Sequence, residues 1–350
     1  MATIKRGVSS YSYQNVIFDR KMGYRDFIRT IREDLNTDGV ELIDETFINH
    51  YPFITDEFVY DWRNTIARYN MKSVTMDVYL DVLQFRDHVM TFEEGAERLK
   101  RDLHIAARLG FENVRCLRPI PAEIIDMCVD TAEKEGVRLG QEIHSPVQIR
   151  YDPEKDWNKA RGNLVDERLV EHMLQRAEKS PFVGLVPDMG LFHTGVTPAL
   201  VAAARRTIQN DDCVDYILEN RNKLPWQDLK RLVAEKFPTI DTDAQITLSL
   251  IRPQASAKPE ELMDIMHIIL SIHGKFYEMV EDPTKPGGYY DPSIPYDEIM
   301  KVLLEGGYDG YINSEFEGQG HTNDLPDDQM FDELEQVRRQ HKMLVALGAV

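Results

Sequence analysis

The ten residues 137-VRLGQEIHSP-146 have the pattern of a short buried strand that ends in an acid and a histidine. Successive side chains of a strand point to opposite faces, so Glu142 and His144 share one face with Gly140. A buried carboxylate is costly unless it is paired or binds a metal. The stretch therefore predicts a strand whose end carries a charged group with a specific partner.

Seven further runs of this kind occur along the chain, with helical patterns between them. The eight expected strands cover residues 6–13, 39–44, 72–78, 112–118, 137–144, 183–188, 270–276 and 310–317. Regular alternation of strands and helices predicts a parallel sheet with crossover helices. Eight such units in 350 residues favour an α/β fold of the (β/α)8 TIM-barrel type over an open sheet, and the glycine-rich fingerprints of nucleotide-binding sheets are missing.

One segment departs from this alternation of strands and helices. Residues 189–269, between the sixth and seventh expected strands, are mostly helical and too many for one crossover helix. We therefore expect residues 1–350 to form a single TIM-barrel domain, with residues 195–265 as an insertion of two or three helices on the barrel rim. Such an insertion would serve as a lid or as a partner surface.

The composition narrows the class of partner. The chain has a net charge of −19 and an isoelectric point near 5, which argues against nucleic acid and anionic membranes as main partners. Its three cysteines show no metal-binding spacing, as expected for reduced, buried thiols. The N-terminus has no apolar signal region and no stretch approaches 18 apolar residues, so we expect a soluble, cytoplasmic protein.

Ionisable side chains stand at the ends of the last four expected strands, where TIM barrels carry their active sites. They are Glu142, His144, Asp188, His273, Lys275, Glu315 and Glu317. Taken singly, each has an ordinary alternative: a helix cap, an interior histidine, a solvated rim acid or a salt-bridge partner. Taken together, converging carboxylates repel one another, and a divalent cation is the simplest way to keep them ionised. Oxygen donors with one imidazole and no thiolate favour Mn²⁺, Mg²⁺ or Co²⁺ over structural zinc.

The order Glu–Asp–His–Glu on strands five to eight resembles the xylose isomerase-like superfamily. That superfamily includes sugar phosphate isomerases and epimerases, ketose 3-epimerases and endonuclease IV. The resemblance covers almost the whole chain and implies four metal ligands, which are Glu142, Asp188, His273 and Glu315. It identifies the fold more specifically than the reaction, since this fold supports several chemistries.

Four runs, 140-GQEIHSP-146, 186-VPDMGLF-192, 271-SIHGKFYEM-279 and 312-INSEFEGQGH-321, are similar to the metal-binding α subunits of bacterial C-glycoside deglycosidases. This closer resemblance implies a lyase that breaks the carbon–carbon bond between a sugar and an aromatic aglycone, such as a flavonoid. It implies a 3-oxo-C-glycoside substrate supplied by a separate oxidoreductase, and a small β subunit as partner. Mn²⁺ is the favoured cofactor, with Mg²⁺ and Co²⁺ as alternatives.

One departure from ketose epimerases supports the closer resemblance. Such epimerases place a histidine a few residues after the strand-six acid, whereas here His193 follows Asp188 by five residues, after an apolar turn. His144 instead lies two residues beyond Glu142, roughly 6–7 Å along the strand. We therefore assign His144 as the leading acid/base for proton removal at sugar C2 and β-elimination of the aglycone. Glu317 is the second candidate, and Lys275 would stabilise an oxyanion or phenolate.

Weaker candidates for substrate contact are Arg118 at the end of strand four, Tyr11 and Tyr13 at the end of strand one, and Trp157 on the loop after strand five; packing explains each of them equally well. Three other functions stay open. A sugar isomerase or 3-epimerase would use the same metal without a partner, an abasic-site endonuclease would need a basic groove and more histidines, and a non-catalytic interaction subunit would bind metal poorly.

Overall fold

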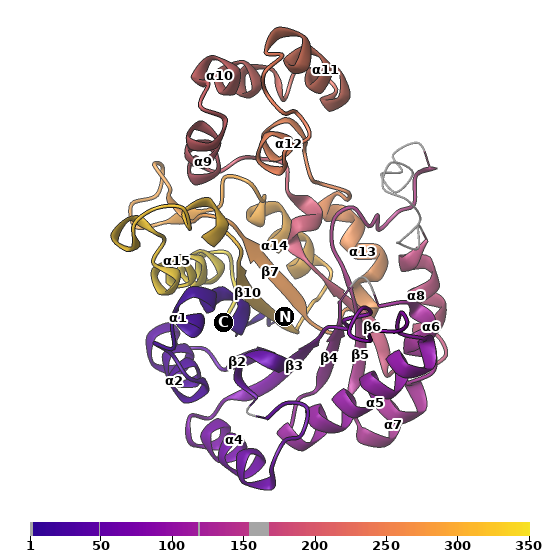
Figure 1. The fold of residues 1–350 in the computed structure, drawn as a ribbon. Coiled ribbons are helices and arrows are strands. Elements are labelled where there is room, and N and C mark those ends of the chain that lie inside the picture. Colours follow the sequence, from indigo (N-terminus) through magenta and orange to yellow (C-terminus); the bar gives the residue numbers. More distant parts are fainter. Residues whose placement is uncertain (1–2, 49, 118–119, 154–167) are drawn as a thin grey trace.

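The computed structural model describes residues 3–48, 50–117, 120–153 and 168–350, and its central element is a parallel eight-stranded sheet curled into a nearly closed barrel (Figure 1). The strands follow the order β6-β5-β4-β3-β2-β1-β10-β7. Isolated bridges from Leu185 to Ile269 and from Asp188 to His273 join the two ends of the sheet. The predicted TIM barrel is therefore confirmed.

All eight expected strands are present, and some are shorter than expected. They are β1 (Lys5–Ser9), β2 (Gly39–Ile43), β3 (Lys72–Val78), β4 (Asn113–Cys116), β5 (Arg138–Ile143), β6 (Val183–Pro187), β7 (Ile272–Phe276) and β10 (Tyr311–Phe316). The expectation that Tyr11 and Tyr13 end strand one is wrong. The Ser9 side chain accepts a hydrogen bond from the Tyr11 amide and turns the chain into a 3-10 helix over Ser10–Tyr13.

Helices surround the barrel in the usual alternation with strands (Figure 1). They are α1 (Gln14–Phe18), α2 (Tyr24–Leu35), α3 (Asp44–Phe47), α4 (Asp56–Arg68), α5 (Phe92–Leu109), α6 (Ala122–Asp126), α7 (Val129–Glu135), α8 (Leu169–Ala177), α14 (Tyr296–Glu305) and α15 (Glu333–Ala346). Local signals fix several ends: the Thr55 hydroxyl caps α4, and Gly110 ends α5 at a positive φ of 84°.

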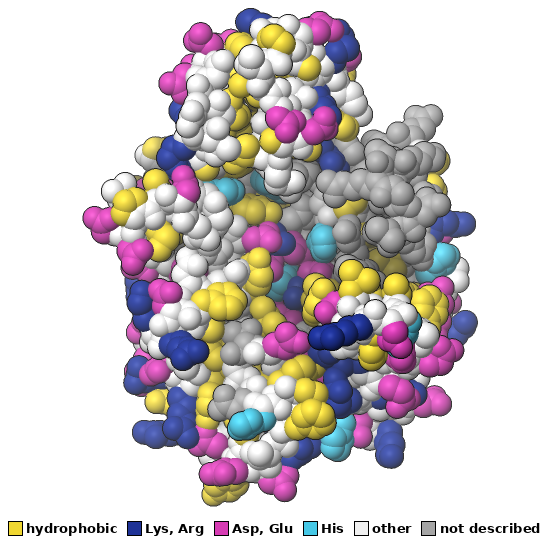
Figure 2. All heavy atoms as spheres, in the orientation of Figure 1, with side chains coloured by type: hydrophobic (Ala, Val, Ile, Leu, Met, Phe, Trp, Pro, Cys, Tyr) yellow, Lys and Arg dark blue, Asp and Glu magenta, His cyan; other side chains and the backbone are white. Residues whose placement is uncertain are grey.

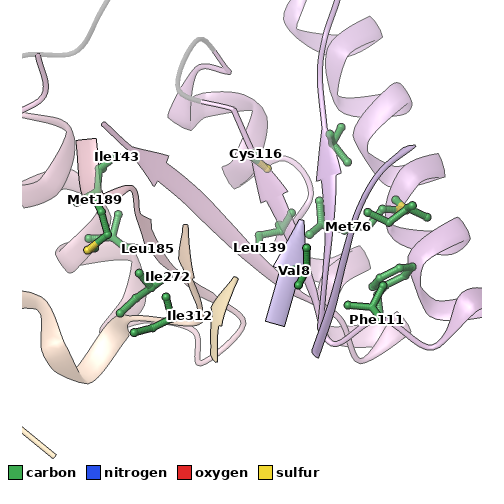
Figure 3. Close-up of a cluster of buried hydrophobic side chains, with 14 of the residues drawn as sticks. Val8, Met76, Phe111, Cys116, Leu139, Ile143, Leu185, Met189, Ile272 and Ile312 are labelled. Atoms are coloured by element: carbon green, nitrogen blue, oxygen red, sulfur yellow. The ribbon is translucent and has the colours of Figure 1, made fainter. Parts of the chain in front are cut away.

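Strand alternation divides the side chains between the barrel interior and the helical layer. Even-numbered neighbours such as Val40 and Leu42 are fully buried against the helices, whereas Glu41 between them points into the barrel. Figure 3 shows part of the resulting apolar layer, including Val8, Met76 and Leu139 on their strands. The charged interior is thus held by a continuous hydrophobic shell.

Five α-helices lie between β6 and β7, of which four form a unit of their own: α9 (Pro198–Ile208), α10 (Asp211–Asn220), α11 (Trp226–Lys236) and α12 (Gln245–Ile251). The expected number, two or three, is therefore too low. These helices bury a separate apolar cluster, and they stand apart from the ring of barrel helices (Figure 1). Leu262 and Ile265 of α13 (Leu262–Ile265) already pack into the barrel core. The division of the chain at 195–265 stays a prediction.

In the part of the chain that the structure describes, no helix combines the length and the apolar character needed to span a membrane. Cys116, Cys128 and Cys213 are free and buried. Burial raises the pKa of the Cys116 thiol, so this side chain acts as a small apolar residue.

Candidate metal centre

The carboxyl ends of the strands bring charged side chains together inside the barrel mouth. Figure 2 shows acidic, basic and histidine side chains gathered in a hollow at the centre of this face, below the helices of residues 198–251. The strands contribute, from β2 to β10, Glu41, Asp77, Arg115, Glu142, His273, Lys275 and Glu315, and Asp188 and Glu317 follow directly after β6 and β10.

His273 lies at the centre of this cluster and is fully buried. Its Nδ1 is 2.9 Å from Glu315 Oε2, 3.5 Å from Asp188 Oδ2 and 3.6 Å from Glu142 Oε1. Adjacent ligands of an octahedral ion with bonds of about 2.1 Å are about 3 Å apart. Donor atoms of Glu142, Asp188 and His273 all lie within 4.8 Å of one another, so this group could hold a metal ion.

The other ring nitrogen of His273 faces the opposite way. Its Nε2 is 2.7 Å from Glu41 Oε1, and Asn313 Nδ2 donates to the second oxygen of Glu41 at 2.8 Å. A carboxylate on one imidazole nitrogen fixes the tautomer and leaves the other nitrogen free to bind a metal. Glu41, Asp77 and His273 form a second group with metal-like spacing, but Asp77 pairs with the Arg115 Nε at 2.7 Å.

Arg115 supplies one of the two permanent positive charges among the described interior residues. It donates to Glu142 Oε1 at 2.6 Å and lies 3.0 Å from His273 Nδ1. Burial alone would raise the pKa of Glu142, but the Arg115 guanidinium outweighs it and lowers that pKa well below its usual value. Glu142 is therefore ionised at neutral pH.

Lys275 supplies the second positive charge. Its Nζ lies 2.9 Å from Asp188 Oδ2, 3.4 Å from Glu315 Oε2 and 3.0 Å from Glu317 Oε2. Burial of Asp188 would raise its pKa, but the Lys275 charge overcomes this and holds the pKa far below the usual range. Burial raises the pKa of Glu315, and the nearby His273 and Lys275 only partly oppose that rise.

The carboxylates of the cluster outnumber its positively charged side chains. Asp188 Oδ2 and Glu315 Oε2 are buried and accept no well-oriented hydrogen bond. Burial and Arg115 lower the pKa of His273, yet the surrounding carboxylates outweigh them and raise it, so a proton is held as counter-charge. A divalent cation would replace this proton and satisfy the orphaned oxygens, and the four residues expected as ligands fit such an ion.

His144 lies just outside this group, beyond the end of β5. Its Nδ1 is 2.7 Å from the carbonyl oxygen of Ser145, to which it donates in the neutral ring. The lone pair then resides on Nε2, which is 4.0 Å from Glu142 Oε2. The side chain is 31% exposed, so this nitrogen is within reach of a molecule in the barrel mouth.

Glu317 lies at the opposite edge of the cluster and is also partly exposed. Its Oε2 pairs with Lys275, and its Oε1 accepts a hydrogen bond of 3.4 Å from the hydroxyl of Tyr11. Burial and the charge of Glu317 raise the pKa of Tyr11 to about 12, so Tyr11 stays a donor at neutral pH. Tyr11 therefore reaches the candidate site although it is not on a strand.

The remaining candidates fall outside the cluster. Tyr13 is fully buried and packs edge-on against Phe27, so it makes no substrate contact. His193 is buried against Tyr277, at 4.7 Å between ring centroids, and burial lowers its pKa to about 4. Arg118 and Trp157 lie outside the described residues.

Sequence reasoning missed Glu41, Asp77 and Arg115. Each is a single charged residue inside an otherwise apolar strand, in the runs GVELI, VTMDV and NVRC. A lone charge in a buried strand must be paired: Arg115 pairs with Asp77, and Glu41 pairs with His273 across the barrel interior. A single charged residue within a buried strand was therefore the sequence signal that could have identified them.

Known proteins resemble the chain in sequence and in fold. No protein-family model matches the chain. A 3'-dehydrocarminate deglycosidase alpha subunit of Microbacterium sp is 26% identical over 360 residues, which cover 98% of this chain and 95% of the relative. A C-glycoside deglycosidase alpha subunit of Arthrobacter globiformis is 27% identical over 346 residues, which cover 93% of this chain and 87% of the relative.

Solved structures match in fold. An L-ribulose 3-epimerase superposes with a TM-score of 0.54 at 14% identity, covering 99% of this chain and 94% of the epimerase. The IOLI protein, solved with a bound zinc atom, gives a TM-score of 0.52 at 12% identity, with 98% of both chains covered. The chain is therefore similar over nearly its whole length to C-glycoside deglycosidase alpha subunits, and its fold is that of the xylose isomerase-like sugar isomerases and epimerases.

Proposed function

We propose that this chain is the metal-binding alpha subunit of a C-glycoside deglycosidase, which releases an aromatic aglycone from a 3-oxo-C-glycoside. The observation that carries the proposal is the position of His144, whose free Nε2 stands beside the carboxylate and imidazole cluster in a chain similar to such alpha subunits. An acid/base beside a candidate cation site is what abstraction of a proton next to a ketone requires.

The reaction balances without water. In a 3-oxo sugar the proton on C2 is acidic because it is next to the carbonyl carbon. Loss of that proton, formation of a C1–C2 double bond and departure of the aryl group with the C1–aryl electron pair give an unsaturated 1,5-anhydro-3-oxo sugar. The aryl carbon takes up one proton and becomes the free aglycone. We therefore propose a carbon–carbon lyase.

Glu142, Asp188, His273 and Glu315 would hold the divalent cation, with Mn²⁺ favoured and Mg²⁺ or Co²⁺ acceptable. When bound, the cation supplies Lewis-acid stabilisation of the negative charge that develops on the sugar oxygens. Glu41 would keep the imidazole of His273 in its tautomer, and Arg115 would hold Glu142 in place.

His144 would remove the C2 proton at its Nε2, because its Nδ1 hydrogen is occupied by the carbonyl of Ser145. A neutral imidazole can both remove a proton and return it. Lys275 would stabilise an oxyanion or a phenolate through its Nζ, and Glu317, 3.0 Å away, is the second acid/base candidate.

We also propose a small β subunit as partner, because the relatives are named alpha subunits. We place it on the helices α9 to α12, because they form a separate unit with its own buried core that stands apart from the barrel helices. Arg206 of α9 ties this unit to the barrel through Asp324, at 2.7 Å. A separate oxidoreductase would supply the 3-oxo substrate.

A sugar isomerase or 3-epimerase remains the second candidate, and one observation favours it. The superposed structures include L-ribulose and D-psicose 3-epimerases, with TM-scores of 0.54 and 0.52. Such an enzyme would return the proton to carbon on the opposite side and would need no partner chain.

The test uses the Mn²⁺-loaded chain with a 3-oxo-C-glucosyl flavonoid, with and without the small partner subunit, and mass spectrometry of the products. We expect free aglycone, in a reaction that depends on the partner. An unchanged C-glycoside in both mixtures, with interconversion of a free ketohexose by the same preparation, would replace this proposal with the epimerase.

A further inference from the structure

A groove opens beside the candidate site, above β1 and β2. We call it the aglycone groove. It has a volume of about 940 Å³, and its walls come mainly from α1, α3 and the start of α2. We propose that this groove binds the aromatic aglycone of the C-glycoside while the sugar occupies the cluster around His273; the assignment rests on the proposed function.

Tyr11 makes the groove continuous with the cluster. Its side chain lines the groove, and its hydroxyl donates to Glu317, which pairs with Lys275. A ligand that extends from the sugar position past Glu317 therefore meets the inner end of the groove. In a C-glycoside, the aryl group is attached directly to C1 and must lie next to the sugar.

The walls suit a flat ring system. Apolar contacts come from Ile17, Phe18, Met22, Ile43 and Phe47, and the volume lies in the range of pockets that enclose drug-sized ligands. Phe18 lines the groove and is 79% exposed, so its ring is open to a ligand there. A bound aromatic aglycone would cover it.

The rim of the groove is polar. Gln14, Arg20 and Glu45 line it, and among the described residues no carboxylate forms an ion pair with Arg20. Apolar walls with hydrogen-bonding groups at the edge match a polyphenol, whose faces are apolar and whose hydroxyl groups lie at its edge. The inferred ligand class is therefore a multi-ring phenolic aglycone.

Substitution of Gly23 by a larger residue can test the groove without disturbing the neighbouring structure. It lines the groove at the start of α2, its φ of −102° is open to any residue, and an added Cβ would meet no atom within 4 Å. Gly23→Trp fills the space, while Gly23→Ser is the matched control that adds only a small capping side chain. Phe18→Ala, at an exposed position, is an independent second variant.

The experiment measures kcat/KM of the full chain with its partner subunit for two 3-oxo-C-glucosides, one with a three-ring flavonoid and one with a single-ring phenol. Gly23→Trp should lower the flavonoid-to-phenol ratio of kcat/KM at least about tenfold relative to Gly23→Ser. Phe18→Ala should act in the same direction. Calorimetric titration of the free flavonoid should show the same loss of affinity.

The two possible failures can be told apart. Equal flavonoid-to-phenol ratios for Gly23→Trp and Gly23→Ser, in chains that cleave both substrates, would overturn the groove assignment and leave the proposed function intact. A wild-type chain that cleaves neither substrate would overturn the proposed function and the groove assignment with it.

Discussion

Removal of the cation should destabilise the protein, because the barrel mouth holds more negative than positive charge. Six carboxylates there have only two permanent positive charges beside them, Arg115 and Lys275. The carboxylates are those of Glu41, Asp77, Glu142, Asp188, Glu315 and Glu317. A ligand that binds only the folded state at one hundred times its Kd stabilises that state by about 2.7 kcal/mol. With an unfolding entropy of about 2.1 cal/mol/K per residue, 350 residues convert this to a Tm increase of about 4 °C.

The assay is scanning calorimetry of chelator-treated protein, before and after addition of Mn²⁺ at one hundred times the measured Kd. Asp188→Asn should lose most of the increase, because Asn keeps the oxygen that accepts from the Gly190 amide but not the charge. Glu317→Gln is the matched control, since it removes one charge without removing a proposed ligand. A full Mn²⁺ shift in Asp188→Asn would refute the ligand assignment.

Three further outcomes follow from the structure. His144→Ala should abolish aglycone release and leave metal content unchanged by elemental analysis; loss of the metal would make His144 a ligand. Glu41→Gln should weaken Mn²⁺ binding about 10- to 100-fold in a titration, because Glu41 holds the His273 tautomer, and an unchanged affinity would contradict that role. Burial, aided by Arg6, lowers the pKa of His341 to about 3, so the folded state keeps this ring neutral and stability is lost as pH falls from about 6.5 towards 3. In urea unfolding, His341→Gln should therefore lose less stability than the wild type between pH 7 and pH 4.5, by about 2–3 kcal/mol, and equal losses would exclude His341 as the cause.

The fold was largely predictable because each strand carries its own boundary signals and alternation. The ends of β1 and β4 were not, since the turn after Ser9 depends on a side-chain hydrogen bond that no hydrophobic pattern reveals. The number of helices between β6 and β7 was also underestimated, because their apolar faces pack on one another and not on the barrel.

For the site, charged residues at strand ends were found because their position in a barrel implies convergence. Glu142, Asp188, His273 and Glu315 do lie together, although their role as ligands stays a prediction. Arg115, Asp77 and Glu41 were missed because their partners lie on other strands, so the pairing appears only when the barrel closes: Arg115 pairs with Asp77 and Glu142, and Glu41 pairs with His273. Tyr11 reaches Glu317 by a turn and not by strand geometry.

The proposed β-elimination is tested most directly with a 3-oxo-C-glucosyl flavonoid that carries deuterium at C2. The Mn²⁺-loaded chain and its partner subunit react with this substrate in H₂¹⁸O, and the isotopes in the products are measured. We predict that aglycone release is accompanied by loss of the deuterium and by an unsaturated sugar without ¹⁸O at C1. Retention of deuterium at C2 in the released sugar, or ¹⁸O at C1, would contradict β-elimination started by proton removal and would require a different reaction at this site.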